Sequence, residues 1–187
     1  MKVAMEATAE EIGLAAEAEY ARARDQRGFE ELVALHQPRI LRTAYRLLGR
    51  LEDAQDAAQE VFLRLLKNLH RIEGDPQAWL YRVTVNICND HHRRRPVVMD
   101  PVVDHADPAP NPEHALALAI EIEERKRLLM AGLQTLPERE RAAVVLRDIE
   151  GLSTREVAEI LGVEEVTIRS HISTARLKLA KYVRKCQ

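Results

Sequence analysis

The residues best suited to a chemical task lie in the last part of the chain, where cations are segregated from acids. Residues 166–187 contain no Asp or Glu, although the whole 187-residue chain has a formal net charge of −2. Their cations are Arg169, Arg176, Lys178, Lys181, Arg184 and Lys185. Positive side chains gathered on one segment favour binding to a polyanion. The chemistry predicted here is therefore recognition of nucleic acid.

Two helices joined by a tight turn must position these cations. Ser153 and Glu156 have the spacing of a capping box, which predicts a helix that begins near Thr154. Gly162 can adopt the left-handed conformation that ends this helix. From Glu165, apolar residues at helical spacing predict a second helix: Ile168, Ile172, Ala175 and Leu179. Such a pair forms a helix-turn-helix, whose second helix enters the major groove; an ordinary hairpin with a solvated basic face is the alternative.

The composition predicts an all-α protein without a metal or other cofactor. Hydrophobic residues make up 46% of the chain, and β-branched residues never alternate with period two over a useful length. No run approaches the roughly 20 apolar residues of a membrane span, and acids stand where a signal peptide would be apolar, so we expect a cytoplasmic protein. Cys88 and Cys186 form no C-x-x-C. Cys88, His91 and His92 could supply three metal ligands, but no fourth ligand lies at a useful spacing. Cys88 is therefore predicted to be a small buried hydrophobic residue, with a redox reporter as the alternative.

The first 28 residues are rich in Ala and Glu and have few large apolar side chains. They predict a helix with frayed ends, closed at residues 25–28. Low hydrophobicity favours a solubilising, partly disordered extension. A docking surface for a regulator is the alternative.

Three helical segments follow. Residues 29–49 carry an apolar pattern that contains Pro38, which predicts a kink or break near residues 35–37, and Gly49 is a plausible C-cap. Residues 51–69 form an amphipathic helix whose inward residues are Ala54, Ala57, Ala58, Val61, Phe62, Leu65 and Leu66. A third helix, from Gln77 to about Arg94, has the core stripe Trp79, Leu80, Val83 and Ile87.

Residues 96–114 differ in kind from both flanking parts. They contain five of the eight prolines, four acids and no Lys or Arg, which indicates an extended acidic linker between two domains. A helix at 115–133 and another at 138–150 follow, with Pro137 at or near the first helical position. The second of these would bury Ala142, Val145, Leu146 and Ile149. Both would pack on the helix-turn-helix.

Taken in order, these segments resemble an extracytoplasmic-function (group IV) sigma factor of bacterial RNA polymerase over about residues 20–184. Three segments resemble successive parts of region 2 of that family: FEELVALHQPRILRTAYRLLG, DAQDAAQEVFLRLLKNL and AWLYRVTVNICNDHHRRR. A fourth segment resembles region 4: LPERERAAVVLRDIEGLSTREVAEILGVEEVTIRSHISTARLKL. The resemblance implies an N-terminal extension (1–28), region 2 (29–95), a flexible linker (96–114) and region 4 (115–187).

The resemblance assigns two roles to region 2. The helix at 53–66 would bind the clamp helices of the polymerase β′ subunit, with Asp56, Gln59, Glu60 and Leu63 as contacts. The helix from Trp79 would read and help to melt the minus-10 element through Arg82, Asn86, Asp90, Arg93, Arg94 and Arg95. The loop at 71–76 would help to hold a flipped-out base, since a pocket and a cationic groove can offset the cost of unstacking.

In region 4 the second helix of the helix-turn-helix would lie in the major groove of the minus-35 element. Its base-edge candidates are Arg169, Ser170, Ser173 and Thr174. Its phosphate candidates are Thr167, His171 and Arg176. Many relatives carry Arg at the position of Thr174, and a hydroxyl cannot make the bidentate contact that Arg makes with guanine. The minus-35 sequence is therefore left open.

The function implied is that of a promoter-specificity subunit that is not itself an enzyme. Its partners would be core RNA polymerase (the β′ clamp helices and the β flap), promoter DNA and an anti-sigma factor wedged between the two domains, and the acidic linker would thread toward the RNA exit path. The nearest alternative is a regulator with a LuxR-like helix-turn-helix, which would need an upstream receiver or ligand domain with βα alternation. A metal hydrolase using His91 and His92 and a helical protein-binding adaptor are two further alternatives.

Overall fold

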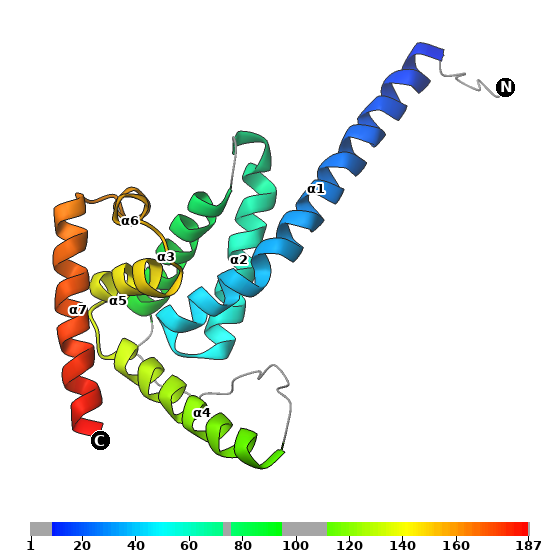
Figure 1. The fold of residues 1–187 in the computed structure, drawn as a ribbon. Coiled ribbons are helices and arrows are strands. Elements are labelled where there is room, and N and C mark those ends of the chain that lie inside the picture. Colours follow the sequence, from blue (N-terminus) through cyan, green and yellow to red (C-terminus); the bar gives the residue numbers. More distant parts are fainter. Residues whose placement is uncertain (1–8, 73–75, 95–111, 187) are drawn as a thin grey trace. The chain divides into compact units, whose positions relative to one another are not determined.

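The computed structural model describes residues 9–72, 76–94 and 112–186, and within these ranges the chain is all-α, with helices and turns and no strand. Figure 1 shows the helices along the chain. They are α1 (Ala9–Leu48), α2 (Leu51–Asn68), the 3₁₀ turn η1 (Leu69–Arg71), α3 (Gln77–Arg94), α4 (Pro112–Gln134), α5 (Glu138–Val144), the π-helical turn η2 (Val145–Ile149), α6 (Thr154–Leu161) and α7 (Glu165–Cys186). None of the described helices is both long and apolar enough to cross a membrane.

Helix α1 continues through residues 25–28, where the first helix was expected to end. It is also continuous through Pro38, which excludes the break, one of the two alternatives predicted near residues 35–37. An internal glycine costs only about 1 kcal/mol, so Gly28 does not end a helix that continues on both sides. After Pro38, the burial of Ile40, Ala44 and Leu47 stabilises the helical conformation. Helix α1 is shared between two compact units that divide between Gln37 and Pro38.

Within the second unit, α2 packs against α3. The predicted inward face of α2 is confirmed at six of its seven positions, and the exception is Leu66, whose exposure is 53%. Leu66 lies one residue beyond the fully buried Leu65, which turns it by about 100° around the helix axis. This turn places Leu66 outside the buried sector.

Helix α3 is buried over a different sector from the predicted one. Leu80 and Ile87 are buried as expected, but Trp79 and Val83 are only half-buried. The additional buried residues are Tyr81, Thr84, Val85 and Cys88. Helix α3 contacts α6 as well as α2, so its buried face is centred on Thr84. Burial raises the pKa of the Cys88 thiol, which fits the reading of this residue as a buried hydrophobe.

Helices α4, α5 and α6 all pack against α7. The apolar stripe of α7 is buried at Ile168, Ile172 and Ala175 and half-buried at Leu179. The stripe predicted for 138–150 is likewise buried, apart from a half-buried Ile149. Of the predicted linker, residues 96–111 lie outside the described residues, and residues 112–114 already belong to α4.

Candidate nucleic-acid interface

The helix-turn-helix has the local geometry that its sequence predicts. Ser153 Oγ accepts a hydrogen bond from the backbone N–H of Glu156 (3.2 Å), and Glu156 Oε2 accepts one from the backbone N–H of Ser153 (2.7 Å). The capping box is therefore complete. Gly162 ends α6 with φ +66°, a left-handed conformation that glycine adopts without steric cost. These two local signals fix where α6 begins and ends, and so where α7 can begin.

The capping box yields a prediction for pH dependence. Hydrogen bonds from Ser153 lower the pKa of Glu156 below its ordinary value of 4.5. A lowered folded-state pKa contributes stability that is present above pH 4.5 and is lost as the pH falls through the lowered value. We expect Glu156→Gln to unfold at a lower temperature than the parent at neutral pH, with the difference vanishing in acid. Thermal unfolding followed by circular dichroism across this range checks it, and a difference that persists in acid would contradict it.

An open groove of about 440 Å³ lies beside the N-terminal half of α7. It is lined by Arg147, Thr154, Arg169, Ile172, Ser173, Arg176 and Leu177. Three arginines and an exposed serine thus line one groove. This combination suits a nucleic-acid backbone and its adjoining base edges. Arg169, Ser173 and Arg176 were predicted for this surface from the sequence, whereas Arg147 and Thr154 were not, since they belong to other elements.

Several of the cations on α7 are paired with carboxylates. Arg176 donates twice to Asp148, at 2.6 and 2.8 Å, and these bonds raise the pKa of its guanidinium. Arg169 donates to Glu165 (2.8 Å), and Lys178 donates to Glu140 (2.8 Å). The three cations are largely exposed, and exposed ion pairs contribute little to stability. Phosphate groups could therefore replace these carboxylates at small cost.

The other predicted minus-35 residues divide into two groups. Ser170 and Ser173 are exposed, whereas Thr167, His171 and Thr174 are half-buried. The Nε2 atom of His171 is shielded from solvent and has no hydrogen-bond partner among the described residues. Of the two exposed serines, Ser173 also lines the groove and Ser170 does not.

The predicted minus-10 residues occupy one side of α3. Arg82, Asn86, Arg93 and Arg94 are exposed and Asp90 is half-buried. Arg93 donates to the carboxylate of Asp90. Arg82 is engaged elsewhere, because its Nη2 donates to the backbone carbonyl of Glu159 in α6 (3.1 Å). Arg95 and residues 73–75 of the predicted base-pocket loop lie outside the described residues.

The predicted polymerase contacts lie together on the outer face of α2. Asp56, Gln59 and Leu63 are exposed, and Glu60 is half-buried and accepts a hydrogen bond from Arg64 (2.8 Å). The exposed Leu66 joins this surface. It was not among the predicted contacts, because the apolar pattern of α2 had placed Leu66 in the core. Leu63 and Leu66 together give α2 an exposed apolar strip beside acids and amides.

Comparison with known proteins identifies the two halves of the described chain. The family model "Sigma-70 region 2" matches residues 32–96, and "Sigma-70, region 4" matches residues 126–179. An "ECF RNA polymerase sigma factor SigE" of Mycolicibacterium smegmatis is 41% identical over 84% of this chain, which spans 62% of that relative. The "RNA polymerase sigma-H factor" of Pseudomonas aeruginosa is 33% identical over 84% of this chain and 86% of its own length.

A solved structure has the same architecture. CnrH, determined in complex with the cytosolic domain of CnrY, superimposes with a TM-score of 0.65 at 25% identity, covering 87% of this chain and 91% of CnrH. Both regions follow in the order that the sequence motifs indicated, and the identity to full-length relatives exceeds 30% over most of the chain. The chain therefore belongs to the ECF family of RNA polymerase sigma factors.

Proposed function

We propose that this chain binds core RNA polymerase and directs it to promoters by reading DNA with α3 at the minus-10 element and α7 at the minus-35 element. The observation that carries the proposal is the groove beside α7, which is lined by three arginines and an exposed serine. Membership of the ECF family supplies the context for that groove. The protein is proposed to act in the cytoplasm with the polymerase and to catalyse no reaction alone.

For the minus-35 element we propose that Arg169, Ser170, Ser173 and Thr174 face base edges and that Thr167, His171 and Arg176 lie near phosphates. The exposure of Arg169, Ser170 and Ser173 supports the first role. Arg147 and Thr154 are proposed as additional phosphate contacts, because they line the same groove from outside α7. Phosphate contacts fix the register, and base contacts supply the sequence preference.

For the minus-10 element we propose that Asn86 and Asp90 lie near a base of the non-template strand, with the arginines of α3 toward phosphates. The arginines in this role are Arg82, Arg93, Arg94 and Arg95. The exposure of Asn86 and Arg94 is compatible with it. The domain boundaries proposed are 29–95 and 115–187, with the extension 1–28 before them and the linker 96–114 between them.

Three protein partners are proposed. The outer face of α2, with Asp56, Gln59, Glu60 and Leu63, would bind the β′ clamp helices, and region 4 would reach the β flap. An anti-sigma factor is the third, supported by the CnrH structure, in which a similar chain is bound to the cytosolic domain of another protein. The LuxR-like alternative is not favoured, because the region 2 match at 32–96 occupies the part where such a regulator would need its own sensory domain.

The test of the proposed function is run-off transcription with purified core polymerase and a pool of genomic promoter fragments, with and without this protein. New, defined start sites that depend on the protein would establish it and would reveal both promoter elements. Tight binding to duplex DNA without binding to core polymerase would contradict it and would return the regulator alternative to favour.

A sharper prediction concerns Arg169. Arg169→Ala is expected to weaken binding of holoenzyme to a minus-35 duplex by about 1–3 kcal/mol and to relax the preference at one base pair, because a base contact is lost. The free protein should keep its stability, since the Arg169–Glu165 pair is exposed. Competition binding with single-base variants of the duplex measures this. Arg184→Ala, at the far end of α7, is the matched control, and equal losses in both variants would contradict a base contact.

A further inference from the structure

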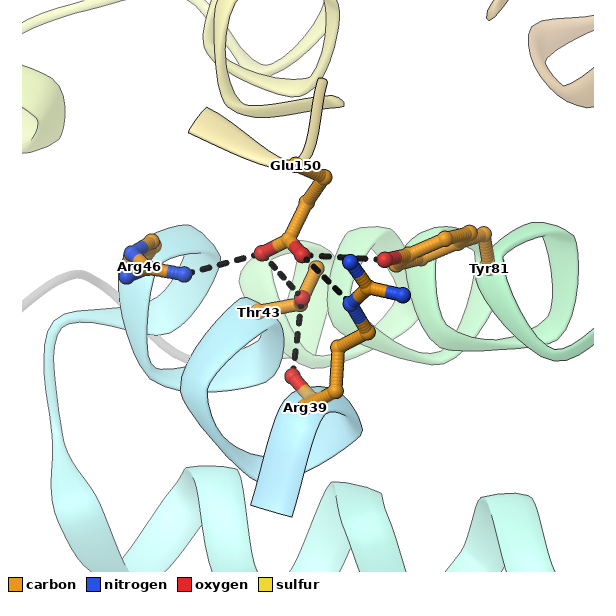
Figure 2. A network of polar contacts seen from close by, with 5 residues as sticks. All are labelled: Arg39, Thr43, Arg46, Tyr81 and Glu150. Carbon is orange, nitrogen blue, oxygen red and sulfur yellow. Dashed lines mark hydrogen bonds and ion pairs between the residues drawn. The ribbon is translucent and has the colours of Figure 1, made fainter. Parts of the chain in front are cut away.

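Glu150 is a buried carboxylate whose partners all lie in region 2, although Glu150 itself belongs to region 4. Its side chain is 5% exposed. Thr43 Oγ1 and Arg46 Nη1 donate to Oε1 at 2.7 and 2.8 Å, Tyr81 OH donates to Oε2 at 2.9 Å, and Arg39 Nε lies 3.4 Å from Oε2. Figure 2 shows these four side chains converging on the one carboxylate. Both of its oxygens are thus engaged by α1 and α3.

Arg141 forms a second joint between the same regions. It is 4% exposed, and its Nη1 donates to the backbone carbonyl of Leu47 (2.5 Å) and lies 2.8 Å from His92 Nε2. The neighbouring Gln134 Nε2 donates to the carbonyl of Arg46 (3.0 Å). A buried carboxylate and a buried guanidinium of region 4 therefore both find hydrogen-bond partners in region 2. Burying such groups without partners would cost several kcal/mol. The hydrogen bonds of Glu150 and Arg141 to region 2 are therefore expected to form and break together with the interface between the two regions.

The same interface also engages part of the proposed promoter surface. Tyr81 of α3 is fully buried, and burial together with the Glu150 carboxylate raises the pKa of its phenol. Arg82, proposed to face minus-10 phosphates, instead donates to the carbonyl of Glu159 in α6. In this arrangement one N–H of the exposed Arg82 guanidinium is directed at α6 and not at DNA.

The interface also sets a geometric limit. Helix α6 packs against both α3 and α7, and packed helix axes lie 8–10 Å apart, so the axes of α3 and α7 are separated by at most about 20 Å near that contact. The minus-10 and minus-35 elements are centred about 25 base pairs apart, which at 3.4 Å per step is about 85 Å. The described arrangement cannot reach both elements at once.

We infer that Glu150 and Arg141 form a latch that holds the free protein closed, and that breaking this latch is a required step on the path to the promoter complex. The inference rests on the proposed function, in which α3 and α7 read the two elements. A closed form lowers the apparent affinity of the protein for core and promoter by the fraction of molecules that are open. Partners that need the separated regions, such as core polymerase, therefore compete with region 4 for region 2.

The test measures opening directly. In a Cys88→Ala background, a donor and an acceptor dye are attached at Gln55→Cys in α2 and at the exposed Cys186 in α7. Single-molecule energy transfer on the full chain should show a dominant compact population. Glu150→Gln should raise the ratio of open to compact molecules about tenfold, the change expected when one charge-assisted hydrogen bond is weakened. Core polymerase should then bind the variant more tightly by up to the same factor.

The control is Glu140→Gln, which removes another carboxylate whose partner, Lys178, lies in region 4 itself. It should leave the compact population unchanged. The latch would be overturned if the parent protein is already mainly open. It would also be overturned if Glu150→Gln and the control have the same ratio of open to compact molecules. Run-off transcription by the same variants separates the two proposals. Normal initiation without a change in energy transfer would overturn the latch alone. Absence of initiation by every form would overturn the proposed function, and the energy-transfer result would still decide whether the latch exists.

Discussion

A chain carrying Leu63→Glu and Leu66→Glu is expected to lose at least about 100-fold in affinity for core RNA polymerase while remaining folded, because a binding interface would then bury unpaired charge. The parent side chains are 46% and 53% exposed on the outer face of α2. Their replacement should therefore leave the core of α2 and α3 intact. Loss of binding with an unchanged circular dichroism spectrum and unfolding temperature is the result expected.

The effect is expected to be large because both leucines sit among the proposed contacts Asp56, Gln59 and Glu60. Apolar anchors surrounded by polar groups carry most of the energy of a protein interface. Fluorescence anisotropy of labelled protein titrated with purified core measures the affinity. Leu35→Glu is the matched control, since Leu35 is a still more exposed leucine, on α1. Parent-like binding by the double variant would show that the polymerase uses another face.

The helix-turn-helix could be predicted almost to the residue because its signals are local. The capping box of Ser153 and Glu156 and the left-handed Gly162 depend only on neighbours in the chain. The same holds for the end of α1 at Gly49, which has a φ of +79°. Ends of helices that carry such a signal are therefore the part of this fold that its sequence encodes most directly.

Faces of helices proved harder to predict, since they depend on partners far along the chain. Leu65 and Leu66 are adjacent and equally apolar, yet only Leu65 is buried in the unit in which α2 packs against α3. The burial of Tyr81 follows from region 4, which α3 meets only after a long intervening segment. The hydrophobic pattern predicts that a helix is amphipathic, and the tertiary contacts decide which of its residues are buried.

The two latch residues carry no signal that a single sequence could reveal. Glu150 and Arg141 are charged, and charged residues are almost never fully buried unless they are paired. Glu150 lies 104 positions from Arg46, and Arg141 lies 94 positions from Leu47. Their roles become visible only when regions 2 and 4 are seen together. The proposed site on α7, by contrast, was indicated by charge segregation, although its individual residues followed from the family resemblance and Arg147 and Thr154 were not predicted.

Arg141→Met is expected to be the most destabilising of the substitutions considered, by about 3–5 kcal/mol, because several buried acceptors lose a donor at about 1–3 kcal/mol each. Burial lowers the pKa of this guanidinium, yet an arginine remains charged at neutral pH. Its partners include three backbone carbonyls, those of Leu47, Gln134 and Leu136. Methionine fills a similar volume but donates no hydrogen bond, so the carbonyls of Gln134 and Leu136 would lose this donor. The carbonyl of Leu47 would keep His92 Nε2 at 2.9 Å.

For a domain of this size the loss corresponds to a fall of roughly 6–20 °C in unfolding temperature. Differential scanning calorimetry of the full chain measures it, and Arg139→Met is the matched control, because Arg139 is exposed only two positions away. Arg141 binds both to its own region, at Gln134 and Leu136, and to region 2, at Leu47. The Arg141→Met variant should therefore both unfold earlier and open more readily, whereas Glu150→Gln should mainly open. An Arg141→Met protein as stable as the control would mean that its hydrogen bonds to the buried carbonyls do not form in solution, and the latch would then rest on Glu150 without Arg141.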